Sequence, residues 1–250
     1  LLDGTDLVVV SPGVRSRLPL LREAEARGIP VWSEIELAAR CARAPLVAVT
    51  GTNGKTTTVS MIAWVLRQSG REAVAAGNIG YPLIQAVEDA DERAVLVVEV
   101  SSFQLAYTER FRPRVAVLLN IAEDHFDWHE DMDEYVAAKA RIWANQGRDD
   151  VVVCNWDDAR CAEAARGAPG RVVFFSRRVE PEASVRVEDG RMVSRLGGAG
   201  ETIMEAGELP LPGGHNLENA MAAAAAAISL GLSPREVGEA LRSFRGLDHR

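Results

Sequence analysis

The residues best suited to phosphate chemistry lie in one glycine-rich stretch, Thr50–Thr57 (TGTNGKTT). It follows the apolar run Leu46–Val49, typical of a buried strand, and leads into a helical pattern from Thr57 to Ser69. A strand, a glycine turn and a helix N-terminus offer backbone N–H groups and a dipole end to an anion. Lys55 adds a charge for outer phosphates, and the Thr56 hydroxyl can ligate Mg²⁺. The strict phosphate-loop pattern, G-x-x-x-x-G-K-[ST], has its first glycine at the position of Val49 in this chain. The alternative to a phosphate-binding loop is therefore an ordinary glycine-rich turn.

Two polar side chains at the ends of other predicted strands could share this site. Glu99 follows the apolar run Ala94–Val98, and an acid there is costly unless it is paired or binds a metal. We expect it to hold Mg²⁺; the alternative is an edge carboxylate in water. Asn78, in the glycine-flanked loop Gly77–Gly80, could orient a substrate group or simply be a turn asparagine. Ser101–Gln104 is predicted as a polar turn that adds outer contacts.

The segment Asn120–His129 is dense in groups that can bind a metal. Asp124 and His125 are candidates for contact with Mg²⁺ or phosphate. Because Mg²⁺ prefers oxygen, a histidine ligand would need a further reason. We assign His129 either to solvent or to an orienting role.

The chain contains only two lysines, Lys55 and Lys139, among its 28 Lys and Arg residues. Lys139 lies four residues after Tyr135 and four before Trp143, on their apolar helical stripe. Burial lowers the pKa of a lysine, and a neutral amine can react with CO₂ to give a carbamate. The carbamate would turn a cation into an oxygen ligand suited to Mg²⁺. The alternative is a lysine that reaches water from the edge of the stripe.

The elements that must position these residues form an α/β pattern from Ala44 onward. Apolar strands with helical crossovers predict a mostly parallel sheet covered on both faces, whose carboxyl ends bind ligand. The predicted strands are Leu46–Val49, Ala73–Ala76, Ala94–Val98, Val115–Leu119, Val151–Cys154 and Val172–Phe175. A hairpin (Val185–Val187 and Met192–Ser194), an Ala-rich helix (Asn216–Leu230) and a helix from Ser233-Pro234 to Phe244 follow.

The first 43 residues are too short to be a domain alone. They are predicted to form a strand (Leu7–Val10), a helix (Leu18–Arg27), a short extended piece (Ile29–Trp32) and a second helix. Ser33 is expected to cap the second helix, with Glu36 completing a capping box. We interpret them as the tail of a Rossmann-like α/β domain that precedes a central domain like those of phosphate-loop NTPases.

Composition indicates a globular cytoplasmic protein. The chain has 250 residues and a net charge of −8, which disfavours nucleic-acid and acidic-membrane partners. No apolar run is long enough to span a bilayer. Cys41, Cys154 and Cys161 show no paired or metal-ligand spacing and are expected to be reduced thiols. The absence of an initiator Met suggests a piece of a longer protein.

Together these motifs resemble those of the Mur ligases, the ATP-dependent amino-acid ligases of peptidoglycan synthesis. The resemblance rests, in chain order, on Thr50–Thr57, Gly77–Gly80, Glu99 with Ser101–Leu105, Asp124-His125, Tyr135–Lys139, His215-Asn216 with Asn219, and Gly246–Arg250. The SSFQL string and Ser11–Gly13 are most similar to the member that adds D-glutamate to UDP-N-acetylmuramoyl-L-alanine. The member that adds the third peptide residue typically has His after the paired serines.

The resemblance implies a monomeric enzyme of three domains. Residues 1–43 would end an N-terminal UDP-binding domain, residues 44–250 would form the central ATP-binding domain, and the C-terminal domain would be missing, leaving the fragment inactive. ATP would phosphorylate the substrate carboxylate, and the amine of D-glutamate would attack the acyl phosphate, in a reaction that serves cell-wall biogenesis.

The resemblance also implies a role for each motif residue. The catalytic set would be Lys55, Asn78, Glu99, His125 and Lys139. ATP would contact Gly51, Thr52, Asn53, Gly54, Lys55, Thr56, Thr57, Asn216, Asn219 and Arg250. Ser11, Asn78 and His125 would bind the UDP-sugar. Thr56 and Glu99 would hold one Mg²⁺, and His125 with carbamylated Lys139 a second. Two alternatives stay open: the ligase for the third peptide residue, and a phosphate-loop module that binds nucleotide without ligation.

Overall fold

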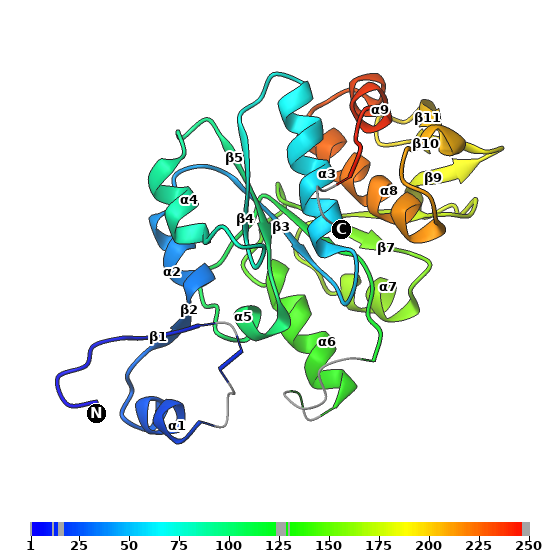
Figure 1. Cartoon of the computed structure of the whole chain (residues 1–250). Coiled ribbons are helices and arrows are strands. Elements are labelled where there is room, and N and C mark those ends of the chain that lie inside the picture. Colours follow the sequence, from blue (N-terminus) through cyan, green and yellow to red (C-terminus); the bar gives the residue numbers. More distant parts are fainter. Residues whose placement is uncertain (1, 12, 15–17, 124–128, 130, 247–250) are drawn as a thin grey trace.

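The strands form two separate sheets in the structure, which is a computed structural model (Figure 1). It describes residues 2–11, 13–14, 18–123, 129 and 131–246. The small sheet pairs β1 (Val8–Val10) in parallel with β2 (Val31–Ser33), and α1 (Pro19–Ala26) connects the two strands. A two-stranded sheet is marginal by itself, so it depends on its neighbours for stability.

The large sheet has nine strands in the order β11-β10-β9-β8-β7-β6-β3-β5-β4. Neighbouring strands from β4 to β9 run parallel, and only β10 and β11 add antiparallel pairs at one edge. The prediction of a mostly parallel sheet is therefore confirmed. The strands are β3 (Leu46–Thr50), β4 (Ala73–Gly77), β5 (Val95–Glu99), β6 (Val115–Leu118), β7 (Val151–Asn155), β8 (Arg171–Ser176), β9 (Ala183–Glu188), β10 (Arg191–Ser194) and β11 (Glu201–Glu205).

Helices cover both faces of the large sheet, as the apolar strands require. One face carries α3 (Lys55–Gln68), α8 (Gly214–Ser229) and α9 (Pro234–Arg242). The other carries α2 (Glu34–Cys41), α4 (Leu83–Asp89), α5 (Ser102–Ala106), α6 (Met132–Ala140) and α7 (Ala159–Ala165). Short 3₁₀ turns lie at Arg141–Trp143 and Ala206–Glu208. Alternate residues of each strand serve the two cores: in β3, Val47 and Val49 join one, and Leu46 and Ala48 the other.

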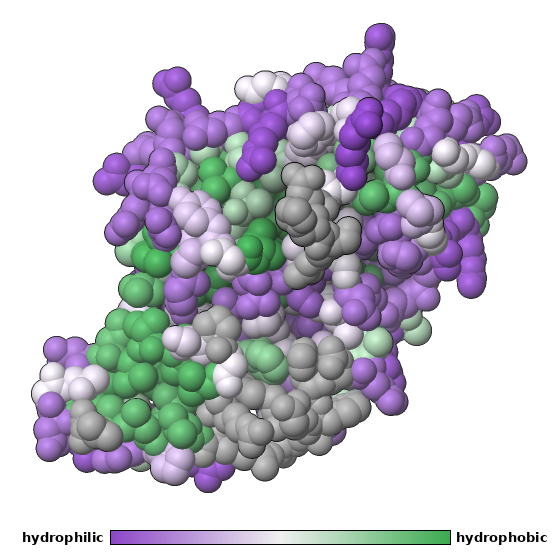
Figure 2. Space-filling model, in the orientation of Figure 1, coloured by the Kyte–Doolittle hydropathy of each residue, from purple (hydrophilic) through white to green (hydrophobic). Residues whose placement is uncertain are grey.

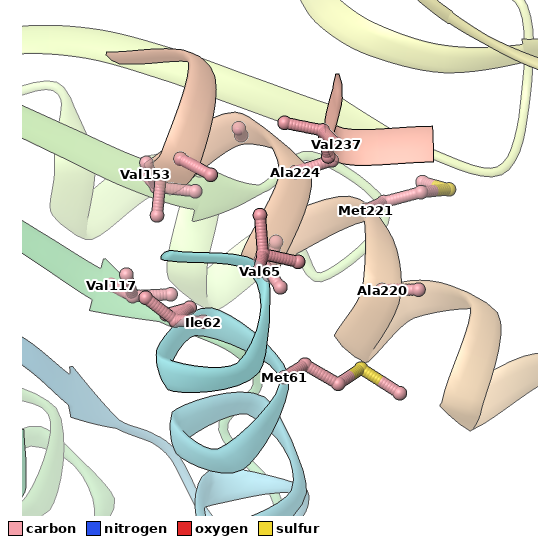
Figure 3. Packing of buried hydrophobic residues seen from close by; sticks show 14 of the residues in the cluster. Met61, Ile62, Val65, Val117, Val153, Ala220, Met221, Ala224 and Val237 are labelled. Atoms are coloured by element: carbon pink, nitrogen blue, oxygen red, sulfur yellow. The ribbon is translucent and has the colours of Figure 1, made fainter. Parts of the chain in front are cut away.

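Small side chains let α8 approach α3 closely. The alanines Ala222–Ala227 are all buried, and Met61, Ile62 and Val65 of α3 belong to the same cluster (Figure 3). Val117 of β6 and Val153 of β7 lie beneath them. The alanine run is thus a tightly packed helix, as its composition predicted.

Two local predictions need correction, and one strand was not predicted. The Ser101–Gln104 segment is not a turn: Ser101 caps α5, and its capping box with Gln104 starts a helix. The Ser33 hydroxyl accepts from Glu36 N as expected, but Glu36 does not return the bond, because its carboxylate binds the backbone of residues 109–111. β11 was not predicted, since its sequence ETIME is half polar.

The surface of the N-terminal segment is the most apolar area in this view of the molecule. Figure 2 shows it where Figure 1 places β1 and α1, and Val9 and Leu18 are each 43% exposed. Among the described residues, no helix combines the length and apolar character needed to cross a bilayer. All three cysteines are described and none forms a disulfide; Cys41 is exposed, whereas Cys154 and Cys161 are buried.

Candidate active site

The glycine-rich stretch forms the predicted connection from β3 to the N-terminus of α3. Gly54 caps α3 with φ of +84°, a left-handed conformation that favours glycine. A Cβ on Gly54 would lie 2.3 Å from Oδ1 of Asn219, which belongs to α8. A Cβ on Gly51 would lie 3.0 Å from the Cβ of Leu119. Both glycines are therefore required by close neighbours as well as by the turn.

The two lysines of the chain meet at this loop. Lys55 Nζ donates to the carbonyl oxygens of Gly51, at 2.9 Å, and Thr52, at 2.8 Å. Lys139 Nζ also donates to Gly51 O, at 2.9 Å, and lies 4.4 Å from the centroid of the Tyr135 ring. The Lys139 side chain is 2% exposed, so it does not reach solvent from the edge of its helix. The two Nζ atoms therefore share one carbonyl acceptor in the loop.

Glu99 joins Thr56 and Asn78 at the carboxyl end of β5. The carboxylate is 4% exposed and accepts from Thr56 Oγ1 at 2.7 Å and from Asn78 Nδ2 at 3.3 Å. The interpretation of Glu99 as an edge carboxylate in water is thereby excluded. These residues and the stretch Thr52–Thr57 line an open pocket of about 340 Å³. Eight of the predicted site residues, from three parts of the sequence, therefore lie at one pocket.

Lys139 lies next to a cluster of aromatic rings formed by Phe103, His129 and Tyr135. His129 is 2% exposed, its Nε2 lies 2.9 Å from Ser102 Oγ, and its ring stacks on Phe103. The assignment of His129 to solvent is wrong, which leaves the orienting role. On its other side Tyr135 contacts the His129 ring, and its hydroxyl lies 3.2 Å from Thr52 Oγ1. The cluster thus connects α5 and α6 to the phosphate loop.

Among the remaining predicted site residues, the structure describes Asn216, Asn219 and Ser11. Asn219 is buried against Gly54, whereas Asn216 donates to Pro212 O at 2.7 Å near the start of α8. Ser11 is exposed and directly follows β1 of the small sheet. Asp124, His125 and Arg250 lie outside the described residues.

A second open pocket, of about 490 Å³, lies at the ends of β6, β7 and β8. Its lining includes Glu218 of α8, which pairs with Arg177 at 2.8 Å. Burial raises the pKa of Glu218; Arg177 opposes this effect, and the carboxylate of Asp157 adds to it. This pocket was not predicted, because its residues come from separate parts of the sequence that only the fold brings together.

Comparison with known proteins shows to which family the chain belongs. Residues 49–227 match the family model described as the Mur ligase middle domain. The chain belongs to the Mur ligase family. It is 48% identical over 248 residues to the UDP-N-acetylmuramoylalanine--D-glutamate ligase of Pelotomaculum thermopropionicum, and 41% identical over 249 residues to that of Thermoanaerobacter pseudethanolicus. These matches cover 99% and 100% of the chain but only 54% and 55% of the relatives, so the chain spans about half of their length.

Solved Mur ligase structures share the fold. The UDP-N-acetylmuramate:L-alanyl-gamma-D-glutamyl-meso-diaminopimelate ligase from Neisseria meningitides aligns with a TM-score of 0.69 at 23% identity, over 98% of this chain and 81% of that one. MurF from Acinetobacter baumannii aligns with a TM-score of 0.66 at 21% identity, over 86% of this chain and 48% of that one.

The pocket at the phosphate loop of this Mur ligase chain fits a nucleotide with Mg²⁺. The glycine loop and Lys55 suit phosphate oxygens, and Thr56 Oγ1 and the Glu99 carboxylate supply the hard oxygen atoms that Mg²⁺ prefers. Within the described residues, no three His, Cys, Asp or Glu side chains group as a metal site. Mg²⁺ does not need such a group, since it keeps several water ligands.

Proposed function

We propose that this chain is the ATP-binding part of a ligase that joins D-glutamate to UDP-N-acetylmuramoyl-L-alanine. The observation that carries the ATP part is that Lys55, Thr56, Asn78 and Glu99 line one pocket, at the carboxyl ends of β3, β4 and β5. The names of the relatives at 41–48% identity support the amino-acid specificity. We further propose that the enzyme is cytoplasmic and monomeric.

In this proposal the chain acts mainly by holding groups in place and neutralising charge. ATP supplies the phosphoryl group that activates the substrate carboxylate, and the D-glutamate amine displaces phosphate to form the amide. Lys55 and the N–H groups at the start of α3 bind the outer phosphates. Asn78, fixed by its bond to Glu99, orients the sugar substrate together with Ser11 and His125. Asn216, Asn219 and Arg250 contact the remainder of the nucleotide.

We propose that two Mg²⁺ ions neutralise the phosphates. Thr56 and Glu99 would hold the first. Lys139 would hold the second with His125, after its neutral amine adds CO₂ and releases a proton. The burial of Lys139 against Gly51 supports this role, because a low-polarity site favours the neutral amine.

We also propose the domain division of the sequence analysis. Residues 1–43 would end a UDP-binding domain, and residues 44–250 would form the ATP-binding domain. The separation of the β1–β2 sheet from the large sheet supports the division. However, α2 of the first segment packs into the same core as β3 and β5, so a stable interface would join the two parts.

The test is ADP release by the full-length protein supplied with UDP-N-acetylmuramoyl-L-alanine, ATP and Mg²⁺. We expect release to require D-glutamate and not to respond to diaminopimelate or lysine. Release that depends on diaminopimelate or lysine instead would assign the protein to the third-residue step. Release that no amino acid alters would overturn ligation and leave a nucleotide-binding module.

A further inference from the structure

The carboxamide of Asn120, just beyond β6, holds the phosphate loop at two points. Its Oδ1 accepts from Asn53 N at 2.8 Å, and its Nδ2 donates to Asn53 O at 3.0 Å. Its own carbonyl oxygen accepts from Thr52 N at 2.9 Å. One residue therefore binds the backbone of two consecutive loop residues, as a neighbouring strand would.

Side chains from the end of β7 and from the connection to α7 fix the backbone on either side of Asn120. Asn155, 3% exposed, donates from Nδ2 to Leu119 O at 3.0 Å. Asp158 accepts from Ile121 N at 2.8 Å through Oδ2, while its Oδ1 caps α7. Both neighbours of Asn120 are thus held, and its side chain is directed at Asn53.

This arrangement determines which N–H groups remain for an anion. The Asn53 N–H is used by Asn120, so it does not point into the phosphate pocket. The first backbone hydrogen bond of α3 runs from Thr58 N to Gly54 O. The N–H groups of residues 55–57 therefore lie in the first turn of the helix, before its regular hydrogen bonding begins. Groups in that position are the donors that a helix N-terminus offers to phosphate.

We propose that Asn120 is a positioning residue for the nucleotide phosphates. It acts through Asn53, with Asn155 and Asp158 behind it, and fixes the loop so that the first turn of α3 faces the β-phosphate. This inference rests on the proposed nucleotide site and extends it to a residue that contacts the loop rather than the ligand.

The test compares ADP with AMP, because only ADP carries a β-phosphate. Calorimetric titration with Mg²⁺ would measure both affinities for the full-length protein and its Asn120→Ala variant. Loss of two hydrogen bonds predicts an ADP affinity about tenfold weaker, with that for AMP nearly unchanged. Asn145→Ala is the matched control, since its carboxamide also makes two hydrogen bonds to the backbone, as a donor to the carbonyls of Glu109 and Phe111, away from the pocket. We expect it to alter neither affinity.

Other outcomes would overturn the inference. Unchanged ADP affinity in Asn120→Ala, or equal weakening for ADP and AMP, would exclude a phosphate-specific role while leaving the nucleotide site intact. If Asn120→Ala does not fold, the same ADP-selective loss must be found in Asp158→Asn, which alters the hydrogen bond to the backbone N–H of Ile121, the residue after Asn120. A folded wild-type protein that binds no ADP would overturn the proposed function as well.

Discussion

At the residue scale, Lys139 gives the sharpest prediction. It is a buried amine 2.9 Å from Gly51 O, where Lys55 also donates. Under the carbamate hypothesis, Lys139→Ala removes a metal-binding oxygen and lowers kcat by about 10²-fold or more, as expected for a group acting on transition-state charge. Added acetate or formate should restore part of the rate, because a small carboxylate can occupy the space that the lysine side chain filled.

Lys139→Arg separates this role from simple charge. Arginine keeps a cation near Gly51 but cannot form a carbamate. The Lys139→Arg variant should therefore be inactive, and added acetate or formate should not restore its activity. Full activity in Lys139→Arg would contradict the carbamate. Thermal unfolding of each variant serves as the stability control, because Lys139 also packs on the Tyr135 ring.

Site residues could be predicted from the sequence where a residue type is unusual for its position in a strand or turn. Lys55 and Thr56 stood out because they follow a glycine turn between a strand and a helix, and Glu99 because an acid after an apolar run is costly without a partner. Asn120 did not, since an asparagine after a strand is common and its partner Asn53 lies 67 residues away. Tertiary structure alone creates that contact. The same holds for His129, which is buried and contacts Ser102 of α5, 27 residues earlier in the sequence.

At the element scale, apolar runs placed the parallel strands correctly because both faces of those strands are buried. β11 was missed because it lies at the sheet edge with three exposed residues. The helix that packs on β11, α9, contains Gly238, and the sequence alone does not explain why a glycine stands there. A Cβ on Gly238 of α9 would lie 1.8 Å from Ile203 O of β11. Gly238 thus lets the helix touch the strand backbone.

Gly238→Ala should therefore destabilise the protein, although alanine normally favours a helix by about 1 kcal/mol over glycine. Moving α9 away from β11 should cost about 1–3 kcal/mol, as for other overpacked sites. Urea unfolding would measure the change. Gly167→Ala is the control, because a Cβ there meets no atom within 4 Å. A stabilised Gly238→Ala variant would show that α9 does not pack on β11 in this way.

At the scale of the whole molecule, Glu36 connects the N-terminal segment to the large sheet. Its carboxylate is fully buried and accepts from the backbone N–H groups of Glu109, Arg110 and Phe111. Arg40 pairs with it at 2.6 Å, binds Glu109 and lies over the Trp32 ring. Burial alone would raise the pKa of Glu36, but these backbone bonds and Arg40 lower it below 4.5.

The lowered pKa gives the effect of Glu36 on stability a defined pH dependence. The ionised carboxylate stabilises the folded state fully above about pH 4.5, the unfolded value, and this stabilisation is lost as pH falls through the lower folded pKa. At pH 7, Glu36→Gln should cost about 2–4 kcal/mol, since its amide nitrogen cannot accept from the N–H groups that the second carboxylate oxygen satisfies. The difference from wild type should shrink as pH falls below 4.5. Glu239→Gln, which removes an exposed pair with Arg235, should change little at any pH. Equal unfolding free energies for wild type and Glu36→Gln at pH 7 would mean that α2 is not anchored through this carboxylate.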